Sequence, residues 1–341
     1  MDWVELFLSL AVILAGAELF TNGVEWIGEN FGLSEGVVGS VLAAIGTALP
    51  ETTLPFVAIL TGHEGGKDIG VGAILGAPFM LSTMAMCLLG TSVLVFSRRG
   101  RRSSDLSPAR HVVSQDLGYF LAMYSLALIA GLWHFKLYKW TLAAVLVVGY
   151  GFYVRRHMRA PDEKELEVEA VGEVKPLYLR RLLRRRDAIA SMPAVWESIT
   201  QTALALAVII GGARLFVAGI ETLAKQFSIP SLPFALLIAP VATELPELFN
   251  SVLWIRRGKD TLAMGNVTGA MVFQSTFPVT IGLLFTPWRL SGDALAAALV
   301  ALGASAVVFA TMEARGRLNA KWLVAQGAFF VGYTAFVLAR L

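Results

Sequence analysis

The chain has 341 residues, of which 56% are hydrophobic and only 16% are charged, with a formal net charge of +3. A soluble domain of this length needs more charge to coat its surface, so the composition excludes an ordinary globular protein and favours an integral membrane protein. The small positive balance does not indicate a nucleic-acid partner, because the basic residues lie between apolar stretches.

Apolar stretches of about 20 residues alternate with short charged segments, and each is long enough to cross ~30 Å of hydrocarbon as a helix. The stretches are continuously apolar rather than alternating, which argues against a β-barrel. The predicted fold class is therefore all-α integral membrane, with ten transmembrane helices. In chain order we expect them at 3–27, 34–61, 67–96, 114–133, 137–154, 194–224, 232–255, 261–286, 293–312 and 321–339.

Lysine and arginine residues divide unevenly between the segments that join these spans. The segments after the third, fifth, seventh and ninth spans carry 21 of them, and the opposite side carries six. The positive-inside rule places the basic-rich segments in the cytoplasm and both termini outside. We therefore expect a multi-pass protein of the plasma (inner) membrane, with the lipid bilayer as its partner.

An internal repeat links the two halves of the chain. A shift of 196 residues aligns 15–51 with 211–247 without a gap. Five spans separate the copies, and this odd number inverts the second copy relative to the first. Inverted repeats with broken helices are typical of secondary transporters, whose ion site lies near the bilayer midplane. The matched residues include Leu49-Pro50-Glu51 with Leu245-Pro246-Glu247. After a slightly shorter loop in the second copy, the match continues with Gly72 opposite Gly265 and Gly76-Ala77 opposite Gly269-Ala270.

The repeat divides the chain into a first five-helix repeat at 1–155, a cytoplasmic linker at 156–193 and a second five-helix repeat at 194–341. The linker residues 161–173 are acidic and typical of a solvated segment. Residues 177–186 are rich in leucine and arginine, and either lie on anionic headgroups or act as a plain topological anchor. Glu18 and Arg214 occupy equivalent positions in the two repeats, so they either pair across the halves or reach headgroups separately.

Two glutamates, Glu51 and Glu247, fall well inside apolar spans. A carboxylate there is costly, so an ion, a proton or a polar partner must compensate it. A single such glutamate could be a protonated packing residue, but two copies at matched repeat positions favour a functional role. Thr47 and Thr243 each lie four residues earlier, which stacks hydroxyl and carboxylate on one helix face.

Pro50 and Pro246 lie directly before these glutamates. Each removes a helix hydrogen bond and crowds the carbonyl group four residues earlier, at Gly46 and Ala242. Backbone oxygens freed in this way are tolerated where they line a cavity or bind a cation. Carboxylate, hydroxyl and carbonyl oxygens are the ligands of hard cations, and Ca²⁺ takes about 6–8 of them.

The two segments Thr47-Ala48-Leu49-Pro50-Glu51 and Thr243-Glu244-Leu245-Pro246-Glu247 resemble the T-S-L-P-E core of the sodium/calcium exchanger α-repeats. Residues 72–77 and 265–270 resemble the G-N-x-x-G-S segment that faces this core. The resemblance spans motifs at about 40–82 and 236–278, and with the ten-span plan it covers nearly the whole chain. It implies that Glu51 and Glu247 are central cation ligands, that Thr47 and Thr243 lie beside them, and that the first and sixth spans slide to switch access.

The sequence departs from that family pattern at several ligand positions. The pattern has G-S-N where this chain has Gly76-Ala77-Pro78 and Gly269-Ala270-Met271, and its serine beside the threonine is replaced by Ala48 and Glu244. The candidate site therefore has fewer neutral oxygens and one more carboxylate. Gln274 is similar, one residue out of register, to a glutamine of the proton-coupled calcium branch. We count Glu244 and Gln274 as further candidate metal ligands.

These features predict a secondary antiporter that exchanges Ca²⁺, or a related hard cation, for H⁺ or Na⁺. Three carboxylates in low dielectric cannot all stay ionised unless a cation balances them, which favours H⁺ as the counter-ion. A Na⁺/H⁺ or other monovalent cation exchanger is the alternative, and an ion channel, an ion sensor or an intramembrane enzyme is less well supported. The sequence shows no nucleotide-binding or hydrolase motif. We therefore expect no catalytic residue and no cofactor, only transported cations; the sequence does not predict an oligomeric state.

Overall fold

The computed structural model describes residues 3–31, 49–61, 65–98, 103–132, 136–157, 175–182, 192–290 and 292–340. These ranges are almost entirely helical, and the two short strands β1 (Asp105–Leu106) and β2 (Leu318–Asn319) pair antiparallel. The helices are α1 (Trp3–Asn30), α4 (Leu49–Leu60), α5 (Gly66–Met80), η2 (Leu81–Ala85), α6 (Met86–Arg98), α7 (Arg110–Leu132), α8 (Lys136–His157), α10 (Tyr178–Leu182), α11 (Val195–Gln226), α12 (Ser231–Thr243), α13 (Leu245–Arg256), α14 (Asp260–Gln274), α15 (Phe277–Phe285), α16 (Gly292–Arg315), α17 (Ala320–Ala325) and α18 (Gly327–Leu338).

Seven helical stretches in the described ranges are long and apolar enough to cross a membrane. They are Trp3–Asn30, Gly66–Arg98, Arg110–Leu132, Val195–Gln226, Asp260–Phe285, Gly292–Arg315 and Ala320–Leu338. The predicted class, an all-α multi-pass membrane protein, is confirmed. The three other expected spans fall on α4, on α8 and on the α12–α13 pair, and the count of ten remains a prediction.

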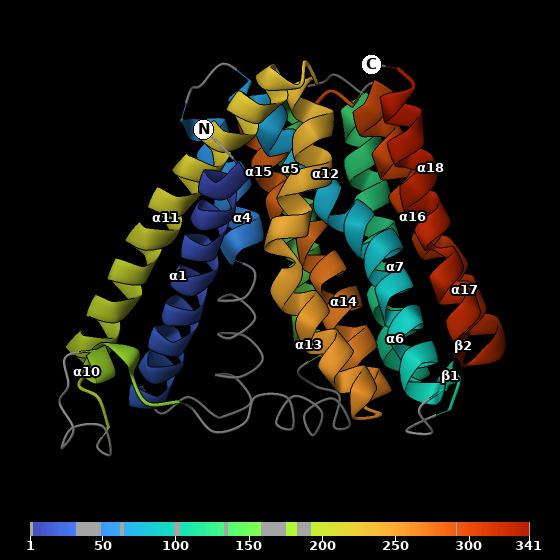
Figure 1. Ribbon diagram of the computed structural model, residues 1–341, viewed down its shortest axis with the longest axis horizontal. Helices are drawn as coiled ribbons and strands as arrows, with labels where there is room; N and C mark the ends of the chain where they lie inside the picture. The colour runs from blue at the N-terminus through green and yellow to red at the C-terminus, as the bar shows by residue number, and fades with distance from the viewer. Residues whose placement is uncertain are drawn as a thin grey trace.

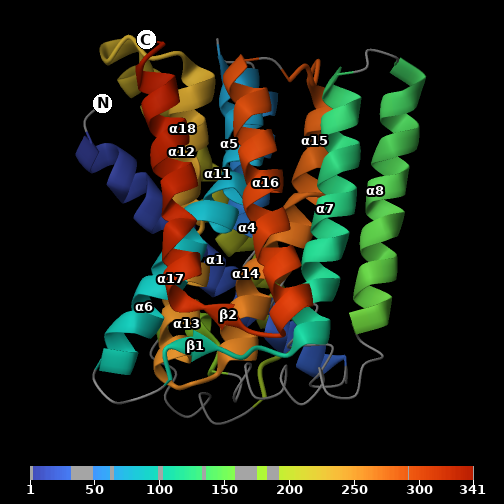
Figure 2. The same cartoon turned by 90° about the vertical axis from the view of Figure 1, so that its right-hand side faces the viewer.

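The basic-rich segments gather at one end of the molecule. In Figure 1 both termini lie at the upper end, while α10 and the two strands lie at the lower end. Figure 2 places the strands, α6 and α13 at the same lower end. Strand β1 follows α6 and strand β2 follows α16, so the described chain places these basic-rich segments together, as the positive-inside pattern requires.

Helices α1 and α11 run antiparallel and pack closely along their length (Figure 1). A Cβ atom added at Gly16 would lie 2.8 Å from Ile209 Cγ1, and one added at Gly212 would lie 2.9 Å from Ile13 Cγ1. Both pairs are related by the repeat shift of 196 residues. Equivalent residues of the two halves therefore make equivalent contacts. The two glycines allow the close approach, since small residues let helix backbones pack tightly in a membrane.

Three of the long apolar stretches are interrupted. Glu244 separates α12 from α13, with Pro246 in the first turn of α13, so the break expected at this proline is present. Ser275 and Thr276 separate α14 from α15, and the π-helix η2 separates α5 from α6. The shift that aligns Gly76 with Gly269 places η2 opposite the α14–α15 break. The third span of each repeat is thus interrupted at equivalent sequence positions.

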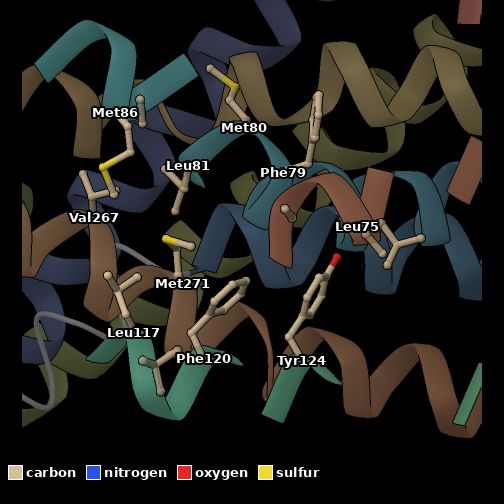
Figure 3. Close-up of a cluster of buried hydrophobic side chains, with 14 of the residues drawn as sticks. Leu75, Phe79, Met80, Leu81, Met86, Leu117, Phe120, Tyr124, Val267 and Met271 are labelled. Carbon is tan, nitrogen blue, oxygen red and sulfur yellow. The ribbon is translucent and has the colours of Figure 1, made fainter. Parts of the chain in front are cut away.

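Buried apolar side chains form two clusters. The larger one joins α5, η2, α6, α7, α14 and α16, and Figure 3 shows part of it around Phe79, Phe120 and Met271. The second joins α1, α4, α11 and α12 with the start of α5. Leu54 of α4 belongs to the second cluster and Leu248 of α13 to the larger one. Helix α4, which carries Glu51, contributes side chains to both clusters, since Ile59 belongs to the larger one.

For two charged positions the sequence leaves alternatives open, and the structure shows contacts at both. Glu18 does not pair with Arg214, which is exposed; its Oε1 accepts hydrogen bonds from Lys175 Nζ at 2.9 Å and from the Tyr178 hydroxyl at 2.7 Å. In the linker, Leu177 is buried and Arg180 forms a buried ion pair with Glu197 of α11, whereas Arg181 is exposed. The rest of the linker, including 161–173, lies outside the described residues.

Candidate functional site

Three carboxylates meet in the interior of the helix bundle. Glu51 lies in the first turn of α4, Glu244 at the α12–α13 break and Glu247 in the first turn of α13. One oxygen atom of each lies within 4.8 Å of those of the other two. The residues are 6%, 0% and 5% exposed, respectively. Three acidic groups this close in an apolar interior repel one another unless protons or cations balance them.

The α12–α13 segment supplies two glutamates to the cluster, and their spacing of three residues places them on the same side of a helix. The Glu244 N–H donates to the Pro240 carbonyl at 2.9 Å, and its own carbonyl accepts from the Leu248 N–H at 3.0 Å. The backbone of Glu244 is thereby tied to the helices on both sides. Glu244 keeps right-handed helical dihedral angles, and Pro246, which has no N–H to donate, lies in the first turn of α13.

Two further candidates lie next to Glu244. Gln274 ends α14, is fully buried and donates from Nε2 to Glu244 Oε1 at 2.8 Å. Thr243 is the last residue of α12 and is also buried. Thr47 lies outside the described residues. The structure thus brings Glu51, Glu244, Glu247 and Gln274 together, with Thr243 adjacent in sequence.

Four oxygen atoms of this cluster are buried and have no hydrogen-bond partner within the described chain: Glu51 Oε2, Glu244 Oε2, Glu247 Oε2 and Gln274 Oε1. Buried polar atoms are normally paired, and unpaired ones are costly. Ionised carboxylates only accept, so these atoms need a proton or a cation rather than another acceptor. A set of carboxylate and amide oxygens suits hard cations such as Ca²⁺, Mg²⁺ and Na⁺.

Asn266 and Ser251 form hydrogen bonds next to the cluster, at the backbone of Glu247. Asn266 Nδ2 donates to the Glu247 carbonyl at 2.9 Å and lies 3.0 Å from Ser251 Oγ, which ties α14 to α13. Asn266 thus acts as a packing amide between the two helices. Ser251 was missed; its signal is the spacing of four residues after Glu247, which places both on one helix face.

Helix α5 approaches α12 too closely to carry larger side chains at the motif glycines. A Cβ atom at Gly72 would lie 2.5 Å from the Leu232 carbonyl oxygen, and one at Gly76 would collide with the Leu236 carbonyl. Ala77, where the exchanger pattern has serine, is buried and supplies no hydroxyl. This helix therefore contributes backbone packing beside the cluster.

The broken helices and the intramembrane cluster of carboxylates define the class as a secondary-transporter-like membrane protein. The chain matches the family model described as sodium/calcium exchanger protein over residues 1–157 and 197–341, and it belongs to that family. A protein of Alkalimonas amylolytica named "Putative antiporter CaxA" is 27% identical over 283 residues, which cover 82% of this chain and 79% of that protein. The sodium/calcium exchanger MaX1 of Methanosarcina acetivorans is 24% identical over 306 residues, which cover 84% of each chain.

Two solved structures share the fold. The H⁺/Ca²⁺ exchanger CAX superposes with a TM-score of 0.69 at 17% identity, covering 98% of this chain and 84% of that one. The sodium-calcium exchanger NCX_Mj superposes with a TM-score of 0.55 at 20% identity, covering 97% of each chain. At these identities the similarity establishes the fold, and the ions of this chain must be argued from its own residues.

Proposed function

We propose that this protein is a secondary antiporter in which Glu51, Glu244 and Glu247 bind the transported cation. The observation that supports this proposal most directly is the cluster of three buried carboxylates, which together with Gln274 holds four buried oxygen atoms without a hydrogen-bond partner in the described chain. Thr243, Gln274 and Thr47 complete the ligand set. The names of the relatives, which describe exchangers and an antiporter, agree with this assignment.

The architecture we propose has ten transmembrane helices in two inverted five-helix repeats, at 1–155 and 194–341, joined by a cytoplasmic linker. The reciprocal contacts of Gly16 and Gly212 support the inverted relation. The basic-rich end is cytoplasmic, which places both termini outside the plasma membrane. Alternating access then exposes the cluster to each side in turn.

The charge of the cluster bears on the transported ions. Three ionised glutamates carry three negative charges, and one Ca²⁺ balances two of them. The third carboxylate then holds a proton in the Ca²⁺-bound state, and further protons replace Ca²⁺ on the return step. Ala77 and Ala270 supply no side-chain oxygen for a Na⁺ ion, and we therefore favour exchange of Ca²⁺ for H⁺ over exchange for Na⁺.

Flux into proteoliposomes tests the proposal. We expect uptake of radioactive Ca²⁺ driven by an outward H⁺ gradient, and weaker uptake driven by an outward Na⁺ gradient of the same size. Na⁺-driven uptake that is independent of pH would contradict H⁺ coupling. Proton movement driven by Na⁺ without any Ca²⁺ flux would instead support a monovalent cation exchanger on the same fold.

A further inference from the structure

A buried aspartate lies in α7, outside the group of three glutamates. Asp116 is 1% exposed and follows Arg110, the first residue of α7, by six residues, which places it roughly 9 Å from the basic-rich end of that helix. Leu117, next to it in sequence, belongs to the larger apolar cluster, and Figure 3 shows Leu117 there with Val267 of α14. A carboxylate in such surroundings is costly unless a proton or a partner compensates its charge.

Two hydroxyl groups from neighbouring helices contact this carboxyl group. The Tyr153 hydroxyl of α8 donates to Asp116 Oδ1 at 2.9 Å, and Thr268 Oγ1 of α14 lies 2.6 Å from Asp116 Oδ2. Tyr153 is 6% exposed and Thr268 is fully buried. The two oxygen atoms of Asp116 therefore join α7 to α8 and to α14.

The number of hydrogen atoms at Thr268 bears on the charge of Asp116. Thr268 Oγ1 also lies 3.0 Å from the Met264 carbonyl oxygen, and a hydroxyl has one hydrogen to donate, whereas a carbonyl only accepts. When Asp116 is protonated, its O–H donates to Thr268 Oγ1, and Thr268 keeps its own hydrogen for Met264. When Asp116 is ionised, the Thr268 hydroxyl turns to the carboxylate and the contact with Met264 loses its hydrogen. Both contacts are therefore complete when Asp116 carries a proton.

Other titratable and charged groups lie on the basic-rich halves of α7 and of the helices packed against it. They are Arg110, His111 and Tyr119 of α7, Tyr150, Arg155, Arg156 and His157 of α8, Asp260 of α14, and Glu313 and Arg315 of α16. Glu313 pairs with Arg110, and Asp260 accepts from a backbone N–H of the segment before α7. The half-exposed His157 packs on the Tyr153 ring at 5.6 Å between centroids. Burial, and to a smaller degree the charge of His111, lower the pKa of His157, so it is mostly neutral at neutral pH.

Helix α14 lies between Asp116 and the glutamate cluster. Thr268 and Asn266 are two residues apart, about 200° around a helix, so they lie on nearly opposite faces of α14. Thr268 contacts Asp116, whereas Asn266 donates to the Glu247 carbonyl. The repeat places Leu75, which has no hydroxyl, opposite Thr268, so the aspartate site belongs to one half of the molecule alone.

We propose that Asp116, Thr268 and Tyr153 form a second proton-binding site, in which the proton on Asp116 holds α14 against α7 and α8 and keeps the glutamate cluster competent for transport. On release, the carboxyl O–H bond breaks, the proton passes to water at the cytoplasmic end, and Asp116 keeps the negative charge. That charge lies in an apolar cluster, so an alkaline cytoplasm weakens the packing of α14. The effect on transport rests on the proposed function, whereas the bound proton does not.

Infrared spectroscopy detects the proton without any flux measurement. In the Ca²⁺-saturated protein at neutral pH, ¹³C at the side-chain carboxyl of aspartate shifts the C=O band of a protonated aspartic acid and leaves the bands of the glutamates unshifted. We expect one such label-sensitive band, lost in Asp116→Asn and kept in the matched control Asp293→Asn, whose native carboxylate pairs with Arg340 at the other end of the bundle. Tyr153→Phe removes the donor to Oδ1, so we expect its band at higher frequency.

The Tyr153→Phe shift keeps the assignment testable if Asp116→Asn does not fold. Absence of a label-sensitive band, or a band that is the same in Asp116→Asn and Tyr153→Phe as in the unmodified protein, would overturn the proposal.

Exchange of radioactive for unlabelled Ca²⁺ needs no proton gradient and gives the functional readout. We expect the exchange rate of the unmodified protein to fall by about fivefold as the pH rises through the range in which the band disappears. Asp116→Asn keeps an N–H in place of the O–H, so its rate should stay constant over that range, with unchanged inhibition by acid. A rate that falls equally in both proteins, or a band that persists at alkaline pH, would refute the control by pH. Absence of flux in the unmodified protein would instead refute the proposed function and leave the infrared test valid.

Discussion

Glu51 and Glu247 occupy matched positions of the two repeats and face each other in one cluster. Glu51→Gln and Glu247→Gln keep the side-chain shape but remove a charge that the cation needs. Breaking a buried charge pair costs about 3–5 kcal/mol, so we expect cation affinity and transport to fall by about 100-fold or more. Flux in proteoliposomes measures the loss, and size-exclusion elution and thermal unfolding in detergent check that the variants fold. Near-normal exchange by either variant would exclude its carboxylate as a central ligand.

Glu244 is the residue that distinguishes this site from the exchanger pattern, which has serine there. Replacing it by serine leaves two carboxylates, which repel each other less than three do and compete less for protons. In Glu244→Ser we therefore expect inhibition of Ca²⁺ flux by acid to begin at a lower pH, with stronger dependence on Na⁺. The pH profile of Ca²⁺ flux, measured with and without Na⁺, gives the answer. A profile that matches the unmodified protein would show that Glu244 is only structural.

At the scale of the helices, two glycines should respond oppositely to the same substitution. Gly76 meets the Leu236 carbonyl of α12, which cannot move away as a side chain could, whereas Gly211 on α11 has open space around its Cβ position. Overpacking costs about 1–3 kcal/mol, and alanine is favoured over glycine within a helix by about 1 kcal/mol. We expect Gly76→Ala to lower the thermal unfolding temperature in detergent and Gly211→Ala to leave it equal or raise it. The reverse order would contradict the close packing of α5 on α12.

The sequence predicts most helices because apolar length alone marks a membrane span, and it predicts the break at Pro246 because proline cannot continue a helix. It does not predict the break at Ser275 and Thr276, or the π-helix at 81–85. Those positions depend on how α14 and α5 pack against their neighbours. The contacts of residues 175–182 also could not be predicted from the sequence. Their partners Asn22 and Gln201 are far apart in sequence and meet only after α1 and α11 pair.

More of the candidate site than of the helix interruptions could be predicted from the sequence, because the repeat itself indicates Glu51 and Glu247. Glu244 lies three residues before Glu247, so helix periodicity allows it on the same face, but its approach to Glu51 depends on how the two segments pack. The pairing of Gln274 with Glu244 joins two segments 30 residues apart and likewise follows from packing. Repeat symmetry alone left open whether Glu18 pairs with Arg214; in the structure the linker places Lys175 beside Glu18 instead.

For the whole molecule, the arrangement predicts which surfaces face the cytoplasm. Arg181 at the end of α10 and Lys67 at the start of α5 are both exposed, whereas Arg180 is buried and unsuitable as an accessibility probe. In a Cys87→Ala background we expect a membrane-impermeant thiol reagent added to intact cells to label Lys67→Cys and not Arg181→Cys. Inside-out vesicles should give the opposite pattern. Labelling of Arg181→Cys from outside would invert the proposed orientation.

The central claim is that cations cross this membrane only in exchange, through a cluster of three glutamates. The most direct test loads proteoliposomes with radioactive Ca²⁺ and dilutes them into buffers that contain either no exchangeable metal cation at high pH, unlabelled Ca²⁺, or acid. The account predicts that Ca²⁺ leaves only into the buffers with unlabelled Ca²⁺ or acid, and that Glu51→Gln retains it in all three. Rapid efflux of Ca²⁺ into the cation-free buffer would indicate a channel, and it would contradict the account.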